Sequence, residues 1–201
     1  MLIFLAAFSF WAWDHSITAS NRFKDQVSVL IGKRAYEGWY RLFYNLTSAA
    51  TFLPILIIGS VLIPADLVWK VSSPFDTIFF AVRLLGLLGI AISLWQTDIF
   101  RFAGLSQLQR YLSGKPDVYL PPVMVTRGAY AYVRHPLYLF SLLVIWFSPT
   151  MTVQQLVFNI GATVYFVIGA IHEERRLLSI FGVEYECYQR NVPGILPVKI
   201  R

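Results

Sequence analysis

The stretch RHPLYLFSLLVIWFSPTMTVQQLVFNIGATVYFVIGAIHEERRL, residues 134–177, decides the fold. It contains two apolar runs, 137–150 and 152–172, which meet at the turn Ser148-Pro149-Thr150 and therefore predict a hairpin of two membrane helices. A helix that leaves from Pro136 and one that returns to Glu173 end on the same face of the membrane. Residues 38 positions apart in sequence, such as His135 and Glu173, can therefore share one polar site.

The rest of the chain is also apolar. Of its 201 residues, 57% are hydrophobic and only 14% are charged, which excludes an ordinary soluble domain. Two further runs, 42–63 and 75–96, are long enough to cross a bilayer at about 20 residues per span. Residues 1–13 are apolar but short. With no basic segment before them and no clear cleavage site after them, they favour a retained first helix over a signal peptide.

We therefore expect an all-α, polytopic membrane helical bundle of about five transmembrane helices. The last two helices form the hairpin, a cytosolic C-terminal helix follows them, and residues 1–201 form a single integral membrane domain. The loop 97–136 is predicted to hold a short helical piece near 99–112 and then an extended stretch, because Ser113-Gly114-Lys115-Pro116 and Pro121-Pro122 interrupt it.

Lys and Arg predict the orientation, since they collect in cytoplasmic loops. With the N-terminus outside, the cytoplasmic stretches 14–41, 97–136 and 173–201 carry fifteen of the seventeen basic residues. The net charge of +6 therefore indicates topology and contact with anionic membrane lipids. It does not indicate nucleic-acid binding.

The run Arg134-His135-Pro136-Leu137-Tyr138 has a local physical meaning. Proline is typical of a first helical turn, so the two residues before it lie at a helix N-terminus, where unpaired N–H groups and the helix dipole favour an anion. A headgroup anchor, a helix cap and an interfacial tyrosine explain the same run without any catalysis. In the same way, Glu173, Glu174 and Arg176 are compatible with a self-paired helix face.

Taken together, however, these residues resemble the superfamily of isoprenylcysteine carboxyl methyltransferases and phospholipid methyltransferases. The match covers about residues 125–197 and consists of Gly128-Ala129-Tyr130, Arg134-His135-Pro136-Leu137-Tyr138, Glu173-Glu174, Leu177, Phe181-Gly182, Tyr185, Tyr188, Val192-Pro193 and Pro197. The resemblance implies an enzyme that transfers a methyl group from S-adenosyl-L-methionine on the cytosolic side of the bundle. The cofactor-binding part would be about 125–197.

The resemblance also implies which residues form the site. The cofactor would be bound by Tyr130, His135, Pro136, Leu137, Tyr138, Glu173, Glu174 and Arg176. The candidates for catalysis are Glu173, Glu174 and Arg134, and either glutamate could be the general base that a thiol or amine acceptor needs. No metal is expected, because a sulfonium already activates the methyl group for in-line transfer.

The N-terminal half narrows the resemblance. His15-Ser16-x-x-Ala19-Ser20, Tyr40-Arg41-x-x-Tyr44-Asn45 and Phe102-Ala103-Gly104-Leu105-x-Gln107 are similar to the bacterial subgroup that includes methanethiol S-methyltransferases. This similarity implies a small or lipophilic acceptor, foremost a thiol, in the inner membrane of a bacterium. It makes His15, Tyr44 and Asn45 candidates for substrate binding.

Other interpretations stay open at this point. The acceptor could instead be an isoprenylcysteine-type carboxylate or a phospholipid amine. His15 also fits a haem-dependent isomerase, because the subgroup is distantly related to zeta-carotene isomerases, and a non-catalytic membrane scaffold is a third possibility. The sequence leaves the oligomeric state open.

Overall fold

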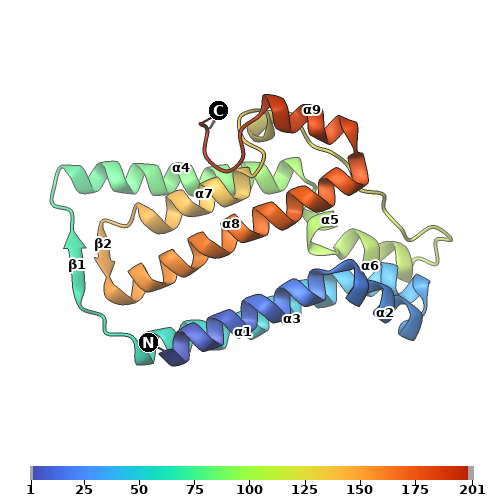
Figure 1. Ribbon diagram of the computed structural model, residues 1–201, viewed down its shortest axis with the longest axis horizontal. Coiled ribbons are helices and arrows are strands. Elements are labelled where there is room, and N and C mark those ends of the chain that lie inside the picture. Colours follow the sequence, from blue (N-terminus) through green and yellow to red (C-terminus); the bar gives the residue numbers. More distant parts are fainter. Residues whose placement is uncertain (1, 199–201) are drawn as a thin grey trace. The chain divides into compact units, whose positions relative to one another are not determined.

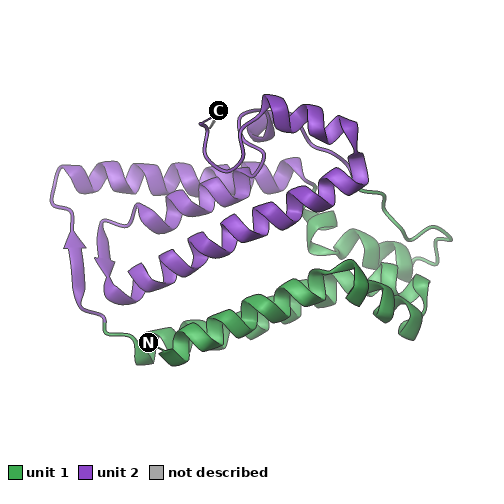
Figure 2. Ribbon diagram, in the orientation of Figure 1, with its two compact units in different colours: residues 1–64, 98–122 green, residues 65–97, 123–201 purple. Residues whose placement is uncertain are grey.

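The computed structural model describes residues 2–198, and most of them are helical (Figure 1). The chain forms two compact units, residues 1–64 with 98–122 and residues 65–97 with 123–201, which we call unit 1 and unit 2 (Figure 2). Each unit combines two separate stretches of the sequence.

Unit 1 is built on two long helices that pack along each other, α1 (Leu2–Ala19) and α3 (Lys33–Leu62). In the sequence, α2 (Asn21–Ile31) connects these two helices, and it begins where the Ser20 hydroxyl accepts a hydrogen bond from the Phe23 backbone N–H. The unit is completed by α5 (Ile99–Ala103) and α6 (Leu105–Leu112), which pack on α3. The helical piece predicted near 99–112 is thus present, divided at Gly104.

Unit 2 carries the predicted hairpin. Its elements are β1 (Leu67–Lys70), α4 (Phe75–Gln96), the short 3-10 helix η1 (Gly128–Ala131), α7 (Pro136–Trp146), β2 (Thr150–Thr152), α8 (Val153–Phe181) and α9 (Val183–Asn191). Helices α4 and α7 lie side by side (Figure 1). They approach closely because Gly89 and Gly86 of α4 leave room for Phe140 and Val144 of α7.

Within residues 2–198, three helices are long and apolar enough to cross a bilayer, α3, α4 and α8, and they confirm the prediction of a membrane protein. The expected span 137–150 is shorter than predicted, because α7 ends at Trp146. Its 11 residues reach only about 16 Å, roughly half of a bilayer core. The chain then runs through 147–149 into β2. Whether α1 and α7 bring the number of transmembrane helices to five stays a prediction.

The segment between the last two apolar runs contains a short strand, β2, which the sequence did not predict. Strand β2 pairs with β1 in an antiparallel two-stranded sheet, and the loop before α4 is thereby tied to the loop before α8. A capping box formed by Thr152 and Gln155 begins α8 directly after β2. From Val153 to Glu173 this helix is about 30 Å long, which is the thickness of a bilayer core. Glu173 therefore lies at the opposite end of unit 2 from the sheet.

A sharp corner at Gly182 separates α8 from α9. This residue has φ 56° and ψ −129°, a conformation that is essentially restricted to glycine. The corner turns α9 back over the N-terminal end of α7. The predicted C-terminal helix is therefore present, and it packs where the sequence motif of residues 134–138 begins (Figure 1).

Candidate functional site

The site begins at the N-terminus of α7 in unit 2, where His135 is the N-cap and the buried Pro136 is the first helical residue. The backbone N–H of Arg134 donates to the carbonyl oxygens of Pro193 (2.8 Å) and Gly194 (3.0 Å). The segment after α9 thus holds the backbone of the motif. The predicted helix start at Pro136 is confirmed.

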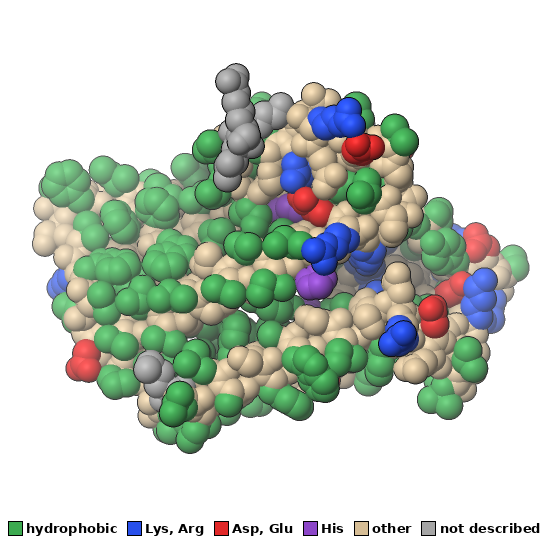
Figure 3. All heavy atoms as spheres, viewed as in Figure 1, with side chains coloured by type: hydrophobic (Ala, Val, Ile, Leu, Met, Phe, Trp, Pro, Cys, Tyr) green, Lys and Arg blue, Asp and Glu red, His purple; other side chains and the backbone are tan. Residues whose placement is uncertain are grey.

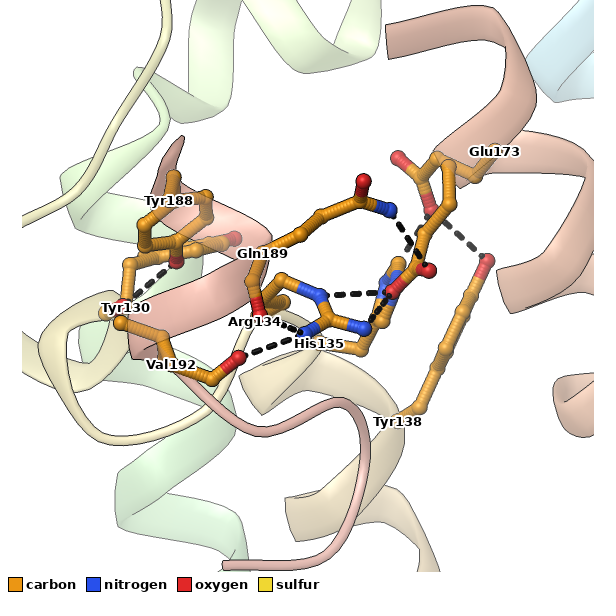
Figure 4. Close-up of polar contacts among 9 residues, drawn as sticks. Tyr130, Arg134, His135, Tyr138, Glu173, Tyr188, Gln189 and Val192 are labelled. Carbon is orange, nitrogen blue, oxygen red and sulfur yellow. Dashed lines mark hydrogen bonds and ion pairs between the residues drawn. The ribbon is translucent and has the colours of Figure 1, made fainter. Parts of the chain in front are cut away.

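Arg134 connects α7, α8 and α9 through its guanidinium group (Figure 4). Its Nε donates to Oε1 of Glu174 at 2.7 Å, and its Nη2 lies 2.6 Å from the same oxygen. Its Nη1 donates to the backbone carbonyls of Gln189 (3.1 Å) and Val192. The Arg134 side chain is only 14% exposed, so this cation is surrounded by partners from the protein itself.

His135 lies between the two glutamates. Its Nε2 is 3.0 Å from Oε1 of Glu174, and its Nδ1 is 3.6 Å from Oε2 of Glu173. Burial by itself lowers the pKa of His135, but the hydrogen bonds and negative charges of Glu173 and Glu174 outweigh burial and raise the pKa above its ordinary value. The environment therefore favours an imidazolium, which can donate from both ring nitrogens.

The two carboxylates differ in the number of hydrogen-bond donors that they accept from and in their exposure. Glu174 accepts from Arg134 and His135 on Oε1 and from Nε2 of Gln189 (3.0 Å) on Oε2, and its side chain is 20% exposed. Glu173 accepts from the Tyr138 hydroxyl at 3.2 Å on Oε2, and its side chain is 37% exposed. Within residues 2–198, Oε1 of Glu173 has no hydrogen-bond donor.

Tyr138 forms an aromatic wall beside these carboxylates. Its ring stacks on the His135 ring (centroids 5.4 Å apart, planes at 12°) and on the Phe166 ring of α8 (5.1 Å, 12°). These two contacts fix the ring of Tyr138, while its hydroxyl is directed to Glu173 (Figure 4). A fixed aromatic ring next to an open carboxylate is a suitable surface for a cation.

A second set of contacts positions the segment before Arg134. The Tyr188 hydroxyl of α9 donates to the carbonyl of Tyr130 at 2.5 Å (Figure 4). The Ala129 backbone N–H donates to Oε1 of Gln96 at the end of α4. Gly128 permits this approach, because it has φ 66° and a Cβ there would lie 2.0 Å from Nε2 of Gln96.

Two tyrosines of α9 complete the surroundings. Tyr185 is only 2% exposed, and within residues 2–198 its hydroxyl has no hydrogen-bond partner. Burial raises the pKa of Tyr185, and the nearby Glu174 raises it further. Burial raises the pKa of Tyr188 to about 12. Both hydroxyls therefore stay protonated at neutral pH, and the hydroxyl of Tyr188 donates to the carbonyl of Tyr130.

The structure brings together most of the residues that the motif predicted. Tyr130, Arg134, His135, Tyr138, Glu173 and Glu174 all lie in this network, and Pro136 and Leu137 form the first turn of α7. Arg176 lies one turn beyond Glu173 and has no ion pair within residues 2–198. On the face shown in Figure 3, charged side chains gather over α9 and the C-terminal part of α8, whereas hydrophobic side chains cover the helix flanks.

Sequence reasoning did not identify two glutamines of the network, Gln96 and Gln189. Gln96 could have been noticed as a polar residue at the last position of an apolar run. Gln189 carries no comparable signal, because a glutamine on a short polar helix is ordinary. Its contact with Glu174 depends on the corner at Gly182.

The residues predicted to bind the acceptor lie in unit 1 and form a cluster of their own. His15 Nδ1 is 2.8 Å from the Ser48 hydroxyl, and His15 Nε2 is 2.7 Å from the Tyr44 hydroxyl. Trp11 stacks on the His15 ring, with centroids 5.1 Å apart. Asn45 instead donates to the carbonyls of Phe102 and Ala103, at 3.0 and 3.1 Å, and thereby fixes α5 on α3.

Known proteins resemble this chain over nearly its whole length. A methanethiol S-methyltransferase from Crocosphaera subtropica is 34% identical over 198 residues, which make up 98% of this chain and 74% of the relative. Methanethiol S-methyltransferase 1 from Bradyrhizobium diazoefficiens is 30% identical over 198 residues, which make up 98% of this chain and 67% of the relative.

A more distant relative matches a shorter part of the chain. Protein-S-isoprenylcysteine O-methyltransferase from Schizosaccharomyces pombe is 37% identical over 81 residues, 38% of this chain and 34% of the relative. No family model and no solved structure matches the chain. The full-length matches confirm the resemblance that the motifs predicted, both to the superfamily and to the subgroup. They identify an enzyme that uses a methyl donor, and the chain belongs to the methanethiol S-methyltransferase family of membrane methyltransferases.

Proposed function

We propose that this protein transfers a methyl group from S-adenosyl-L-methionine to a small or lipophilic thiol, at the site where α7, α8 and α9 of unit 2 meet. The observation that carries the proposal is the open carboxylate of Glu173, which stands beside the fixed ring of Tyr138 and next to a saturated His135–Glu174–Arg134 network. The names of the relatives support a thiol as the acceptor, and methanethiol is the first compound to test.

The site is chemically suited to such a donor. S-adenosyl-L-methionine carries a sulfonium, an amine, a carboxylate and ribose hydroxyls, so it needs anionic, aromatic and cationic partners. The carboxylate of Glu173 supplies a negative charge for the sulfonium, and the ring of Tyr138 lies beside this carboxylate. Arg176 is a cation without an ion pair within residues 2–198. The buried and unpartnered hydroxyl of Tyr185 is a further donor for a bound polar group.

The two glutamates have different tasks in this proposal. Glu173 is the general base, because its carboxylate is the more exposed one and has an oxygen free to take a proton. It removes the proton from the thiol. The sulfur lone pair then forms a bond to the methyl carbon while the bond from that carbon to the donor sulfur breaks. The bound donor would supply an activated methyl group and leave as a neutral thioether.

Glu174 and Arg134 are positioning residues. Their ion pair joins α7 to α8, and the guanidinium also binds the carbonyls at the end of α9. Arg134 was a candidate for catalysis, but four of its N–H groups already have partners. We assign the carboxylate of the cofactor to Arg176. His135 keeps Glu173 in place and shields the charge that the two carboxylates share.

For the acceptor we retain His15 and Tyr44 of unit 1 and assign Asn45 a structural role. The His15 ring has an oxygen neighbour at each nitrogen, so it can pass a proton between Tyr44 and Ser48. The amide of Asn45 is committed to two backbone carbonyls. The apolar chain suggests that acceptors reach the protein from the membrane, and we place the enzyme in the inner membrane of a bacterium, with the N-terminus outside and the site facing the cytoplasm.

The alternatives have less support. A haem isomerase would need a histidine nitrogen as an axial ligand, but each ring nitrogen of His15 and His135 has an oxygen neighbour at 2.7–3.6 Å, and the third histidine, His172, is an exposed residue of α8. A scaffold would not need an open carboxylate in a network of four charged residues. The substrate test below decides whether a carboxylate or a phospholipid amine can be the acceptor. We also propose that residues 1–201 work as a single functional domain.

The decisive experiment uses the full chain purified in detergent, S-adenosyl-L-methionine with a deuterated methyl group, and methanethiol. We expect calorimetry to show saturable donor binding and gas chromatography to show the labelled thioether. An isoprenylated cysteine and a phospholipid amine serve as competing acceptors in parallel. Donor binding without a product from any thiol would overturn the thiol assignment, and a folded protein that binds no donor would overturn the proposed function.

A further inference from the structure

A polar cavity lies in unit 1, apart from the residues that the proposed reaction uses. It has a volume of about 330 Å³ and is formed by α5, α6 and the loop that follows them. Its walls include the side chains Asp98, Arg101, Ser106, Arg110, Ser113 and Lys115. Three cations and one acidic residue thus line the cavity together with two serine hydroxyls, and a second carboxylate, that of Asp117, lies 3.8 Å from Nη2 of Arg110.

The cations of this cavity are held in place by the protein backbone. Arg110 donates through Nε and Nη2 to the carbonyl of Asp117, at 3.0 and 2.6 Å, and Arg101 donates through Nη2 to the carbonyl of Pro121. Each guanidinium keeps further N–H groups for a ligand. Lys115 has no ion pair within residues 2–198. The carboxylate of Asp98 caps α5 by accepting from the Arg101 backbone N–H, and it keeps its negative charge, so the three cations of the cavity wall outnumber it.

The loop itself is also anchored, so the cavity is preformed. Arg34 of α3 donates to the carbonyl of Lys115 at 2.7 Å, and the Lys115 backbone N–H donates to the carbonyl of Arg110 at 3.2 Å. A tetrahedral oxyanion is the ligand that such a wall fits best, because guanidinium forks and hydroxyls supply several donors to neighbouring oxygens. A phosphate group has this geometry and charge.

The surroundings of the cavity indicate a lipid as the source of the phosphate. Large apolar side chains on the same two helices are exposed, notably Phe100 (62%) and Leu112 (67%). Both helices pack on the polar start of α3: Tyr111 contacts Gly38, and Arg41 donates to the carbonyl of Phe102. The apolar part of α3 begins directly after Arg41. Basic groups and exposed apolar groups at the end of a membrane span are typical of the headgroup level.

We propose that this cavity binds the phosphate of an anionic phospholipid headgroup. The acyl chains of the lipid pack against the exposed apolar side chains of α5 and α6. The same three cations could bind a soluble phosphate, so the experiment separates these two sources. The proposal does not depend on the reaction proposed above.

The test uses the full chain in a non-ionic detergent and short-chain phosphatidylglycerol as the probe, with binding measured by calorimetry. Phosphatidylcholine with the same chains carries a phosphate but no net charge, so it reports on binding that does not depend on an anionic headgroup, and inorganic phosphate reports on a soluble anion. We expect phosphatidylglycerol to bind saturably and inorganic phosphate not to displace it at equal concentration. Equal affinity for the two lipids, or displacement by inorganic phosphate, would overturn the lipid assignment.

Two variants and one matched control locate the site. Lys115→Gln removes a cation whose side chain has no ion pair, and Ser106→Asp puts a carboxylate into the cavity at the first turn of α6, where it favours the helix. Arg22→Gln removes one charge from an exposed residue of α2, outside the cavity. We expect Lys115→Gln to weaken phosphatidylglycerol binding about fivefold and Ser106→Asp to weaken it more, with no change in the control. Wild-type affinity in both variants would exclude this cavity.

Discussion

Glu173 and Glu174 are consecutive residues of α8, yet their carboxylates are bound in opposite ways. Glu174 is saturated by Arg134, His135 and Gln189, whereas one oxygen of Glu173 has no donor within residues 2–198. Neighbouring positions on a helix point about 100° apart, so one side chain can face α7 and α9 while the next stays accessible. This difference separates a positioning glutamate from a reactive one, and the variants below test it.

Glu173→Gln should remove turnover while the protein stays folded. The amide keeps the size of the side chain but cannot take a proton, and loss of a general base typically costs about 10²–10⁴ in rate. The measurement is kcat for methyl transfer to methanethiol, together with the melting temperature in detergent. Glu184→Gln, on the outer surface of α9, is the control and should retain full activity. Normal turnover in Glu173→Gln would contradict the assigned role.

Glu174→Gln should instead destabilise the protein. Arg134 would be left without its carboxylate although only 14% of its side chain is exposed, and we expect a loss of about 2–3 kcal/mol. The control breaks the ion pair of Glu186 with Arg190, whose side chains are 47% and 75% exposed, and should cost less than about 1 kcal/mol. Thermal unfolding in detergent compares Glu174→Gln with Glu186→Gln. Equal melting temperatures would show that the Arg134 network does not stabilise the fold.

The fold and the site could be predicted from the sequence to different extents. The long apolar runs and the cluster of His135 with Glu173 followed from composition and from the geometry of a hairpin. The strands β1 and β2 did not, because each has only three or four residues and gives no periodic signal. The helix α7 was predicted too long for a different reason. The apolar run continues after Trp146 in the sequence, but the helix ends there.

The choice between Glu173 and Glu174 also needed the structure. Both residues are glutamates at the same membrane exit, and nothing in their spacing distinguishes them. Most of their partners come from the N-terminal end of α7, and Gln189 comes from α9, whose direction is set by the backbone conformation of Gly182. Gln189 could not be assigned to the site without this corner.

The stability that His135 provides should depend on pH. The environment raises the pKa of His135 above its ordinary value of about 6.5, so the folded state binds the proton more tightly than the unfolded state. This contribution is fully present below pH ~6.5 and is lost as the pH rises through the folded-state pKa. The facing groups are Glu173, Glu174 and Tyr138. The difference in melting temperature between wild type and His135→Gln should therefore shrink from pH 6 to pH 9. A difference that does not vary with pH would mean that the ring is neutral.

Gly182→Ala should disturb the site from a distance. A Cβ is strained at φ 56° and ψ −129°, and such a residue costs about 1–3 kcal/mol. The corner would move α9, whose end supplies the carbonyls of Gln189 and Val192 to Arg134. We expect a lower melting temperature and a lower kcat. Gly194→Ala is the matched control, because its new Cβ would meet Arg134 at an ordinary 3.5 Å. Equal effects of the two variants would contradict the claim that the conformation of Gly182 positions α9.

Tyr138 allows the aromatic face and the hydroxyl to be tested separately. Tyr138→Phe keeps the stacking on His135 and Phe166 but removes the hydrogen bond to Glu173. We expect it to bind the donor with nearly unchanged affinity and to lower kcat about tenfold, since Glu173 loses the contact that orients it. Tyr138→Ala removes the ring as well and should weaken donor binding. Calorimetry with S-adenosyl-L-methionine and the turnover assay distinguish the two effects. If both variants bind the donor like the wild type, Tyr138 does not line the donor site.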